Sequence, residues 1–408
     1  MNRILETLAG RRILLLQGPV GPFFAKLANT LHARGQAVFK INFHAGDVLF
    51  APLNSILFRA PMDQWPDFLA TFIQENNIDA IVLYGDCRPI HQAAIVVARH
   101  LGCFIGVFEE GYIRPSYITF EEGGVNANST IPRDPAFYRA LPAPEPLPKL
   151  KPLNGFWHLI AYGALYFAAG AVGRRLTPHY QHHRPLSLRE GLHWARSIWR
   201  KWCAAPHDHA CQRMLTQAGA PDFFLVPLQV FNDYQVRTHS AYETVEDFIV
   251  ETLRSFARRA PEKSHLLFKH HPMDRGYVDY RALIQVHADR LGISDRVHYG
   301  HDFHLPTLLA RAQGVIVINS TVGLSALHHG APTKVCGTAL YDMKGLTFQG
   351  TLDAFWREAK GAWPDTALLA RYQHYLIAHT QSPGNFYRGT LSAVVPANIK
   401  GKTPLLAA

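Results

Sequence analysis

Apolar and polar positions alternate in blocks along the first third of the chain. Residues 13–16 form a continuous apolar run bounded by Gly18 and Pro19, and residues 23–34 repeat apolar side chains at helical spacing. A short continuous apolar run is typical of a parallel strand that is covered on both faces. The alternation continues with apolar runs at residues 38–43, 80–86 and 103–111 and a helical stretch at 91–100. This order of strands and helices predicts a Rossmann-like half.

The second half of the chain repeats the pattern. An apolar run extends from Phe223 to Val230, and helical periodicity follows at residues 245–259. Further strand and helix candidates are residues 265–272, 280–291, 296–300 and 314–337. We therefore expect an α/β protein in which two Rossmann-like domains face a central cleft, the default place for a ligand.

Length and composition agree with this organisation. A chain of 408 residues has room for roughly two domains, and 48% hydrophobic with 18% charged residues describes a folded protein. The five cysteines include no CxxC pair, which suggests neither zinc nor disulfides and favours the reducing cytoplasm. The expected divisions are an N-terminal Rossmann-like half (1–150), a helical insert (151–215), a C-terminal Rossmann-like half (216–350) and a helical segment (351–408).

The insert contains the most membrane-like part of the chain. Residues 156–173 are apolar and about the minimum length for a span, yet they include His158, two tyrosines and three glycines. We therefore favour a buried or surface-docking helix over a transmembrane one. Residues 174–201 are rich in Lys and Arg with interleaved tryptophans. This composition suits an anionic membrane surface, or equally a solvated helical face. No nucleic-acid motif accompanies the net charge of +10, so we expect no nucleic-acid partner.

The first candidate for chemistry is Asp233, which follows the apolar run 223–230. In open α/β sheets, ligands lie outside the carboxyl ends of the strands, so a reactive side chain would be placed here. The alternative is that Asn232 and Asp233 only begin a turn and cap the next helix.

Two neighbouring carboxylates end another predicted strand. Glu109 and Glu110 close the run 103–111, with Arg114 nearby. Adjacent carboxylates can raise one another's pKa, which suits a general acid or base. The alternative is an exposed acidic turn that forms a salt bridge with Arg114.

The glycine-rich turn after the first strand is a candidate anion site. Gln17, Gly18 and Gly21 lie between strand and helix, where backbone amides can meet an anion. The segment is neither a GxGxxG nor a Walker loop, so a tight turn explains it equally well.

Two strand ends in the second half carry residues suited to a phosphate. Lys269 and His271 precede the strand-stopping Pro272, and a Lys and a His there can stabilise a departing nucleotide. The segment Asn319-Ser320-Thr321 joins a strand to a helix. Its hydroxyls and amides can cap that helix or hold a phosphate.

Together these motifs resemble the capsular polysaccharide synthesis family of bacterial β-Kdo glycosyltransferases. The resemblance covers most of the chain and rests on LLLQGPVGPFF, EEGYIRP with EEGGVNANS, FND, KHHP and NSTVGLSAL…HGAP. The single-module length matches the members that start the lipid linker, whereas the longer members carry two transferase modules.

The resemblance implies a GT-B-like fold and a retaining transfer of Kdo from CMP-β-Kdo to a (lyso)phosphatidylglycerol acceptor. It makes Asp233 the nucleophile and Glu109-Glu110 the acid/base pair. Relatives often have Asp in second place, which leaves open which glutamate acts. It assigns the CMP side to Lys269, His271, Pro272, Asn319, Ser320 and Thr321, and we assign the acceptor or anion side to Gln17, Gly18, Gly21 and Arg114.

By the same resemblance, no metal or other cofactor is expected. The expected location is the cytoplasmic face of the inner membrane, with other capsule synthesis and export proteins as further partners. Two alternatives stay open: a GT-B transferase with another nucleotide-activated donor, and a non-catalytic capsule export component.

Overall fold

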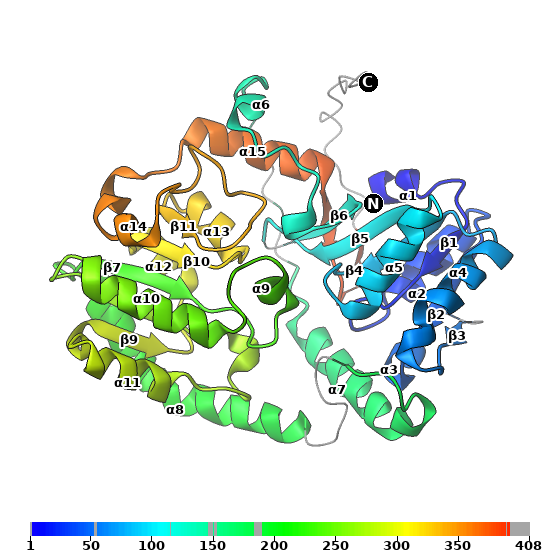
Figure 1. Cartoon of the computed structure of the whole chain (residues 1–408), viewed down its shortest axis with the longest axis horizontal. Coiled ribbons are helices and arrows are strands. Elements are labelled where there is room, and N and C mark those ends of the chain that lie inside the picture. Colours follow the sequence, from blue (N-terminus) through cyan, green and yellow to red (C-terminus); the bar gives the residue numbers. More distant parts are fainter. Residues whose placement is uncertain are drawn as a thin grey trace.

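Two separate β-sheets, each covered by helices, make up the protein (Figure 1). The computed structural model describes residues 2–52, 55–114, 116–145, 150, 153–182, 190–388 and 390–391. Within these residues, the prediction of an α/β protein with two Rossmann-like halves is confirmed.

Five parallel strands form the Rossmann-like part of the N-terminal sheet, in the order β5-β4-β1-β2-β3. They are β1 (Ile13–Leu15), β2 (Val38–Asn42), β3 (Ile56–Leu57), β4 (Ala80–Tyr84) and β5 (Phe104–Glu110). The helices of this half are α1 (Asn2–Thr7), α2 (Phe23–His32), α3 (Ala45–Leu49), α4 (Trp65–Glu75) and α5 (Pro89–His100), whereas α6 (Pro135–Arg139) packs on α15 (Thr366–His379) and joins the core of the C-terminal half. The strand order reverses between β1 and β4, and ligands of this fold bind outside the strand ends at such a switch point.

The C-terminal sheet repeats this order with five parallel strands, β11-β10-β7-β8-β9. They are β7 (Phe223–Pro227), β8 (His265–Lys269), β9 (Val297–Gly300), β10 (Gly314–Val317) and β11 (Thr333–Val335). Its helices are α9 (Tyr234–Thr238), α10 (Val245–Arg259), α11 (Arg281–Arg290), α12 (Leu305–Arg311) and α13 (Val322–His328). The switch point of this half lies between β7 and β10.

Strand β7 is shorter than predicted. The apolar run continues to Val230, but the strand ends at Pro227, and the last hydrogen bond to β8 runs from Leu228 N to Lys269 O (2.9 Å). The chain then turns, and Asp233 N donates to Val230 O (2.9 Å). Asp233 therefore lies in a loop beyond the strand rather than at the strand end.

The C-terminal segment is not only helical, which corrects the prediction for residues 351–408. Helix α14 (Leu352–Glu358) packs on α10, and α15 (Thr366–His379) is followed by strand β12 (Gln381–Asn385). That strand pairs antiparallel with β6 (Tyr117–Glu122), and β13 (Thr390–Leu391) pairs with β12 in turn. The unpaired edge of β6 supplies the backbone partners that make this polar segment a strand.

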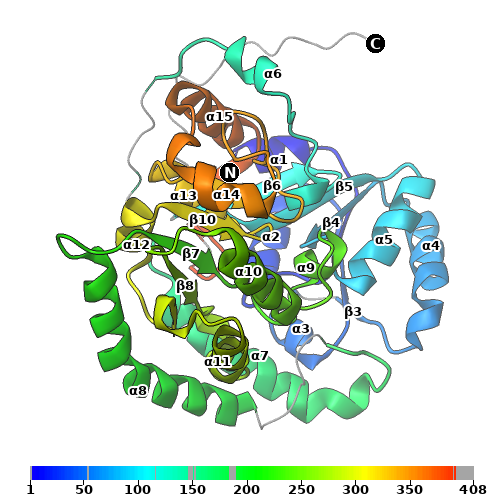
Figure 2. The ribbon, with the colours of Figure 1, turned by 60° about the vertical axis from the view of Figure 1, so that its left-hand side comes forward.

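The insert consists of two helices that run along one edge of the molecule (Figures 1 and 2). They are α7 (Phe156–Val172) and α8 (Glu190–Thr216); residues 183–189, and residues 146–149 and 151–152 of the Pro-rich linker, lie outside the described part. Helix α7 packs against α3, and α8, which contains Pro206, lies against β9 and α12 and bends in Figure 2. Among the described residues, the segment Phe156–Leu176 is long and apolar enough to cross a membrane by length and composition.

Candidate active site

Asp233 is the N-cap of helix α9, as the alternative interpretation predicted. One carboxylate oxygen accepts from Gln235 N (2.9 Å), and the other accepts from Gln229 Nε2 (3.1 Å). Burial raises the pKa of Asp233 above its ordinary value, although these two hydrogen bonds oppose the shift. A cap needs no raised pKa, so capping does not account for the whole environment of this carboxylate.

Hydrogen bonds hold the loops after β7, β8 and β10 together around Asp233. Phe231 N donates to the buried Asp274 (2.7 Å), which follows β8. Gln229 Nε2 also donates to Asn319 Oδ1 (2.9 Å), which follows β10. The amide of Asn319 donates to Gln235 O (2.9 Å), so Asn319 supports the α9 loop, and its contact with a donor stays a prediction.

Glu109 and Glu110 end β5 in different surroundings. Glu110 accepts from the hydroxyls of Tyr387 (2.8 Å) and Tyr84 (3.4 Å), whereas Glu109 accepts from the backbone N–H of Glu110 (2.9 Å). Burial and the charge of Glu110 raise the pKa of both tyrosines well above the ordinary value, so both hydroxyls remain donors. Glu110 is thus tethered by two side chains.

The pKa of Glu109 is raised to about 7. Burial is the largest cause; the hydrogen bond from Glu110 N opposes it, and the charges of Glu110, Asp86 and Asp233 add to it. A carboxyl that titrates near neutral pH suits proton transfer.

The two halves meet directly beside these residues. Cys87, in the loop after β4, lies with its Sγ 3.4 Å from Nε2 of His239, which follows α9. Burial lowers the pKa of His239, and the charge of the nearby Asp86 opposes this. The loop after β4 therefore faces the segment that carries Asp233.

One ring nitrogen of His271, Nδ1, accepts a local hydrogen bond. It is the N-cap of the short 3-10 helix Pro272–Asp274, and its Nδ1 accepts from Met273 N (3.2 Å). The neutral ring then carries its proton on Nε2, which makes that nitrogen a donor. Pro272 occupies the first position of this turn, where it needs no N–H partner.

Lys269 and the hydroxyl turn have mainly local contacts. Lys269 is buried, its Nζ donates to His270 O (3.4 Å), and burial lowers its pKa to about 8 while the charge of Asp302 opposes this. Ser320 Oγ accepts from Val322 N (3.2 Å), and Thr321 precedes α13 without a side-chain cap. Contact of these three residues with a donor phosphate stays a prediction.

Side chains of the protein make the hydrogen bonds of Gln17, at the predicted anion site. Gln17 is buried; its Nε2 donates to Asp47 (3.1 Å) and to the hydroxyl of Tyr180 (2.9 Å), and its Oε1 accepts from Arg88 (2.7 Å). The positive group at this switch point is therefore Arg88, and a contact between Gln17 and an anion stays a prediction.

Packing explains the two glycines of the same turn. A Cβ on Gly18 would lie 2.8 Å from the ring of Phe24. Gly21 has a φ of +105°, and a Cβ there would lie 2.7 Å from Tyr162 of α7. Arg114 is exposed and its Nε donates to Gly111 O (3.2 Å). Among the described residues it forms no ion pair with Glu109 or Glu110, so the salt-bridge alternative is wrong.

Comparison with known proteins identifies the family. Residues 79–387 match the family model described as capsule polysaccharide biosynthesis protein. The chain belongs to this capsule family. It is 41% identical over 391 residues to the capsule polysaccharide export protein KpsS of Escherichia coli (95% of this chain, 99% of the relative). It is also 40% identical over 404 residues to the capsule polysaccharide modification protein LipB of Neisseria meningitidis serogroup A (95% and 94%).

A solved structure of a β-Kdo 2,7 transferase, KpsC of Thermosulfurimonas dismutans, is similar at 14% identity with a TM-score of 0.40 (88% of this chain, 89% of that chain). The match to the capsule family runs from just before β4 to Tyr387. It therefore includes Glu109, Glu110 and Asp233, whereas Gln17 lies before it. The predicted family resemblance is confirmed.

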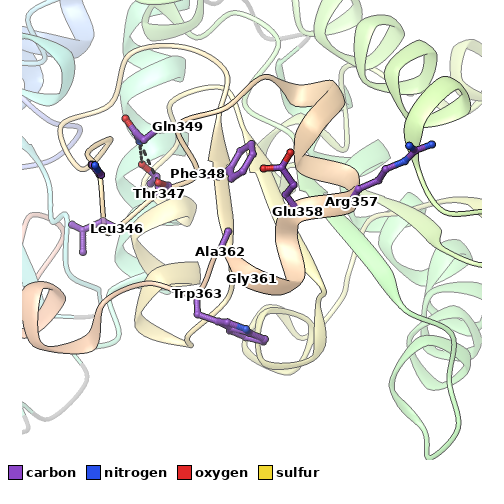
Figure 3. A pocket seen from close by; sticks show the side chains of 11 residues that line it. Leu346, Thr347, Phe348, Gln349, Arg357, Glu358, Gly361, Ala362 and Trp363 are labelled. Carbon is purple, nitrogen blue, oxygen red and sulfur yellow. Dashed lines mark hydrogen bonds between the residues drawn. The ribbon is translucent and has the colours of Figure 1, made fainter.

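An open pocket lies away from the predicted site residues. About 590 Å³ in volume, it is lined by segments around Phe348, Glu358 and Trp363 (Figure 3). None of the predicted site residues lines it. No group of three His, Cys, Asp or Glu side chains that could hold a metal ion is found within the described ranges.

Sequence reasoning missed several residues of the site. Gln229 joins Asp233 to Asn319, Tyr84 and Tyr387 hold Glu110, and Arg88 faces Gln17. One signal was available for Gln229: it follows its strand by two residues, as Gln17 follows β1. Nothing in the local pattern indicates Tyr387, because its partner is 277 residues away.

Proposed function

We propose that the protein is a retaining β-Kdo glycosyltransferase. It moves Kdo from CMP-β-Kdo to a (lyso)phosphatidylglycerol acceptor and so starts the lipid linker of a capsular polysaccharide. The observation that carries this proposal is the contact between Cys87 Sγ and His239 Nε2 (3.4 Å), at which the half that contains Glu109 meets the half that contains Asp233. The raised pKa of Glu109, to about 7, supports it. Membership of the capsule family supports the biological context.

The first step uses Asp233. Its carboxylate attacks the anomeric carbon of Kdo, CMP leaves with the bonding electrons, and the configuration inverts once. Gln229 and the amide of Gln235 orient the carboxylate. We assign Nε2–H of His271 and the backbone around Ser320 to the CMP side, where neutralising the phosphate charge stabilises the leaving group.

The second step uses Glu109. With a pKa of about 7, it takes the proton of the acceptor hydroxyl while that oxygen attacks the anomeric carbon of the Kdo–Asp233 intermediate. The bond between Kdo and Asp233 breaks, and the Asp233 carboxylate leaves with the bonding electrons. The configuration inverts again, so the transfer retains the β-anomer. We assign the base to Glu109 because Glu110 is held by two tyrosine hydroxyls. The scheme requires no metal or other cofactor.

Mass spectrometry of one reaction tests the proposal. Purified protein is incubated with CMP-Kdo and a fluorescent lysophosphatidylglycerol, and the acceptor should gain the mass of one Kdo. NMR of the product should then show the β-configuration. Transfer from a different nucleotide sugar alone would point to another donor. The second candidate is a non-catalytic export component, since the Escherichia coli relative is named an export protein; absence of any transfer would favour it.

We also propose that α7 and α8 bind the cytoplasmic face of the inner membrane. Helix α7 contains no Asp, Glu, Lys or Arg, and large apolar side chains are exposed along it at Trp157, Ile160, Leu165 and Val172. On α8, Trp199 and Trp202 are 69% and 76% exposed, close in sequence to Arg196. Exposed tryptophans beside basic residues suit a helix at an anionic membrane surface.

The way α7 is held favours a peripheral position. Tyr166, on its buried face, donates to Asp47 Oδ1 (3.1 Å), and its hydroxyl lies 2.8 Å from Nε2 of His44. A helix that crossed the bilayer would lose these bonds and leave buried polar groups without partners.

Vesicle flotation tests the membrane proposal. The wild type should bind phosphatidylglycerol vesicles at low salt and be released at high salt. The Trp199→Ser/Trp202→Ser variant should bind about tenfold or more weakly, since burying one large apolar side chain contributes roughly 1.5–3 kcal/mol. Trp363→Ser is the control, because Trp363 is also exposed (63%) but lies in the chain between α14 and α15, helices on the side of the molecule opposite α7 and α8 (Figure 1). Protein that stays on vesicles through carbonate extraction would indicate a spanning helix.

A further inference from the structure

No role is predicted for Arg88 from the sequence, but its position in the fold calls for one. It follows β4 at the N-terminal switch point and is the N-cap of the 12-residue helix α5, but its side chain makes no cap hydrogen bond. The guanidinium is half-buried. Among the described residues, no carboxylate forms an ion pair with it. A half-buried cation at a switch point without an anionic partner is suited to an anionic ligand.

A chain of contacts fixes the guanidinium. Asp47 accepts from Gln17 Nε2, which turns Gln17 Oε1 toward Arg88, and NH1 of Arg88 donates to that oxygen (2.7 Å). Two nitrogens of the fork are not used in this bond. Because the planar fork suits bidentate contact with a phosphate, an arginine held in this way is pre-organised for one.

Arg88 also lies next to the catalytic carboxylates. Its guanidinium carbon is 5.5 Å from the ring centroid of Tyr84, whose hydroxyl donates to Glu110. One tyrosine therefore separates the cation from the Glu109-Glu110 pair. An anion on Arg88 would place a short flexible group attached to it within reach of Glu109.

On its other side, Arg88 borders the membrane-facing insert. Gln17 and Asp47 bind the hydroxyls of Tyr180 and Tyr166, and Tyr166 belongs to α7. The order along the N-terminal half is thus insert, Arg88, Tyr84 and Glu110. This order matches a lipid acceptor: acyl chain, phosphate, glycerol spacer and reacting hydroxyl.

We propose that Arg88 binds the phosphate of the acceptor headgroup. This assignment rests on the function proposed above and names the residue that recognises its acceptor. The phosphate of CMP-Kdo is assigned to the C-terminal half with His271 and Ser320, and the KM for CMP-Kdo measured below tests whether Arg88 binds the Kdo carboxylate instead. Arg88 acts by binding and has no part in the proton transfer.

Kinetics with two acceptors test the assignment. The substitutions are Arg88→Gln and Arg88→Lys, with Arg34→Gln as control, since Arg34 is an exposed arginine just after α2. The acceptors are lysophosphatidylglycerol and a monoacylglycerol with the same chain, which has the hydroxyl but no phosphate. Arg88→Gln should raise KM for lysophosphatidylglycerol at least tenfold, because this acceptor loses a charge-assisted hydrogen bond to its phosphate. KM for the monoacylglycerol and KM for CMP-Kdo should stay within about twofold of the wild-type values. Arg88→Lys should recover part of the loss.

Equal losses with both acceptors, or a raised KM for CMP-Kdo, would overturn the proposal. If the wild type transfers no Kdo at all, the proposed function fails, and calorimetry then decides the site separately. Glycerophosphoglycerol, the soluble headgroup, should bind the wild type and lose at least tenfold in affinity in Arg88→Gln. Unchanged binding, or binding no tighter than that of inorganic phosphate, would remove Arg88 as a headgroup site.

Discussion

The two switch points of the molecule contain the same pair of side chains. A glutamine follows the first strand of each half by two residues, Gln17 after β1 and Gln229 after β7, and each donates from Nε2 to an aspartate at 3.1 Å. Each also spans its switch point: Gln17 accepts from Arg88 after β4, and Gln229 contacts Asn319 after β10. The halves differ in what surrounds the aspartate.

In the N-terminal half the aspartate, Asp47, has several hydrogen-bond donors and cations around it. Burial alone would raise the pKa of Asp47, but the charges of His44 and Lys40 and the hydrogen bonds from Phe43 N and Gln17 lower it to about 2. Among the described residues, Gln229 and Gln235 alone donate to the Asp233 carboxylate, and burial raises its pKa. We therefore propose that the same glutamine–aspartate pair is a structural element in the N-terminal half and a reactive one in the C-terminal half, according to the number of donors and cations around the carboxylate.

The strongest test of this contrast is Asp233→Asn. Asparagine caps a helix as well as aspartate does, so the fold should persist while the nucleophile is lost. Turnover should fall by roughly 1,000-fold or more, equivalent to about 4 kcal/mol of barrier. The control is Asp134→Asn, since Asp134 caps the five-residue helix α6 through the same kind of bond (2.9 Å to Ala136 N). If Asp233→Asn kept more than about a tenth of wild-type turnover, Asp233 would be only a cap.

The second test concerns the partner of Asp233 in the other half. Glu109→Gln should lower turnover about 100- to 10,000-fold, the range for a lost general base. In the wild type, kcat/KM should rise with pH and level off above about 7, because Glu109 must be ionised to accept the proton. The variant should lack this rise. A wild-type profile that is flat between pH 5 and 9 would exclude Glu109 as the base.

A third test asks whether donor contacts belong to the C-terminal half alone. His271→Ala removes the Nε2–H donor and should weaken CMP binding about tenfold, as expected for a hydrogen bond to a charged group. Calorimetry with CMP measures this, with His209→Ala on the exposed face of α8 as control. Lipid binding should be unchanged in both variants. Normal CMP affinity in His271→Ala would leave this histidine with only its role as the cap before Met273.

Local signals explain which parts of the fold could be predicted. Helix α10 has the predicted bounds, 245–259, because Thr244 and Asp247 form a capping box at its start. Strand β12 was missed because its partner, β6, lies far away in the sequence and its own pattern is polar. In the site, the motifs indicated Asp233 and Glu109 as candidates, and their roles stay predictions. The only local signal for Gln229 is its position two residues after its strand. Tyr387 and Arg88 could not be found, because their side chains contact residues far away in the sequence.

The smallest effect on turnover is expected for Asp47→Asn. This variant is also the sharpest test of the contrast between Asp47 and Asp233. The depressed pKa means that the ionised carboxylate stabilises the fold at neutral pH, by roughly 2 kcal/mol for a shift from 3.8 to about 2. Urea unfolding at pH 7 should show this loss, whereas kcat per folded molecule at saturating acceptor should change less than about threefold. KM for the anionic acceptor should rise, because Asp47 positions Gln17 and Gln17 holds Arg88. The difference between variant and wild type in the free energy of unfolding should shrink as the pH falls from about 4 to 2. Over this range Asp47 becomes protonated in the unfolded state near pH 4 and in the folded state only near pH 2, so the advantage of the ionised carboxylate is lost. A variant with unchanged stability and a large loss of turnover would show that the N-terminal aspartate is reactive too, and the contrast between the halves would be lost.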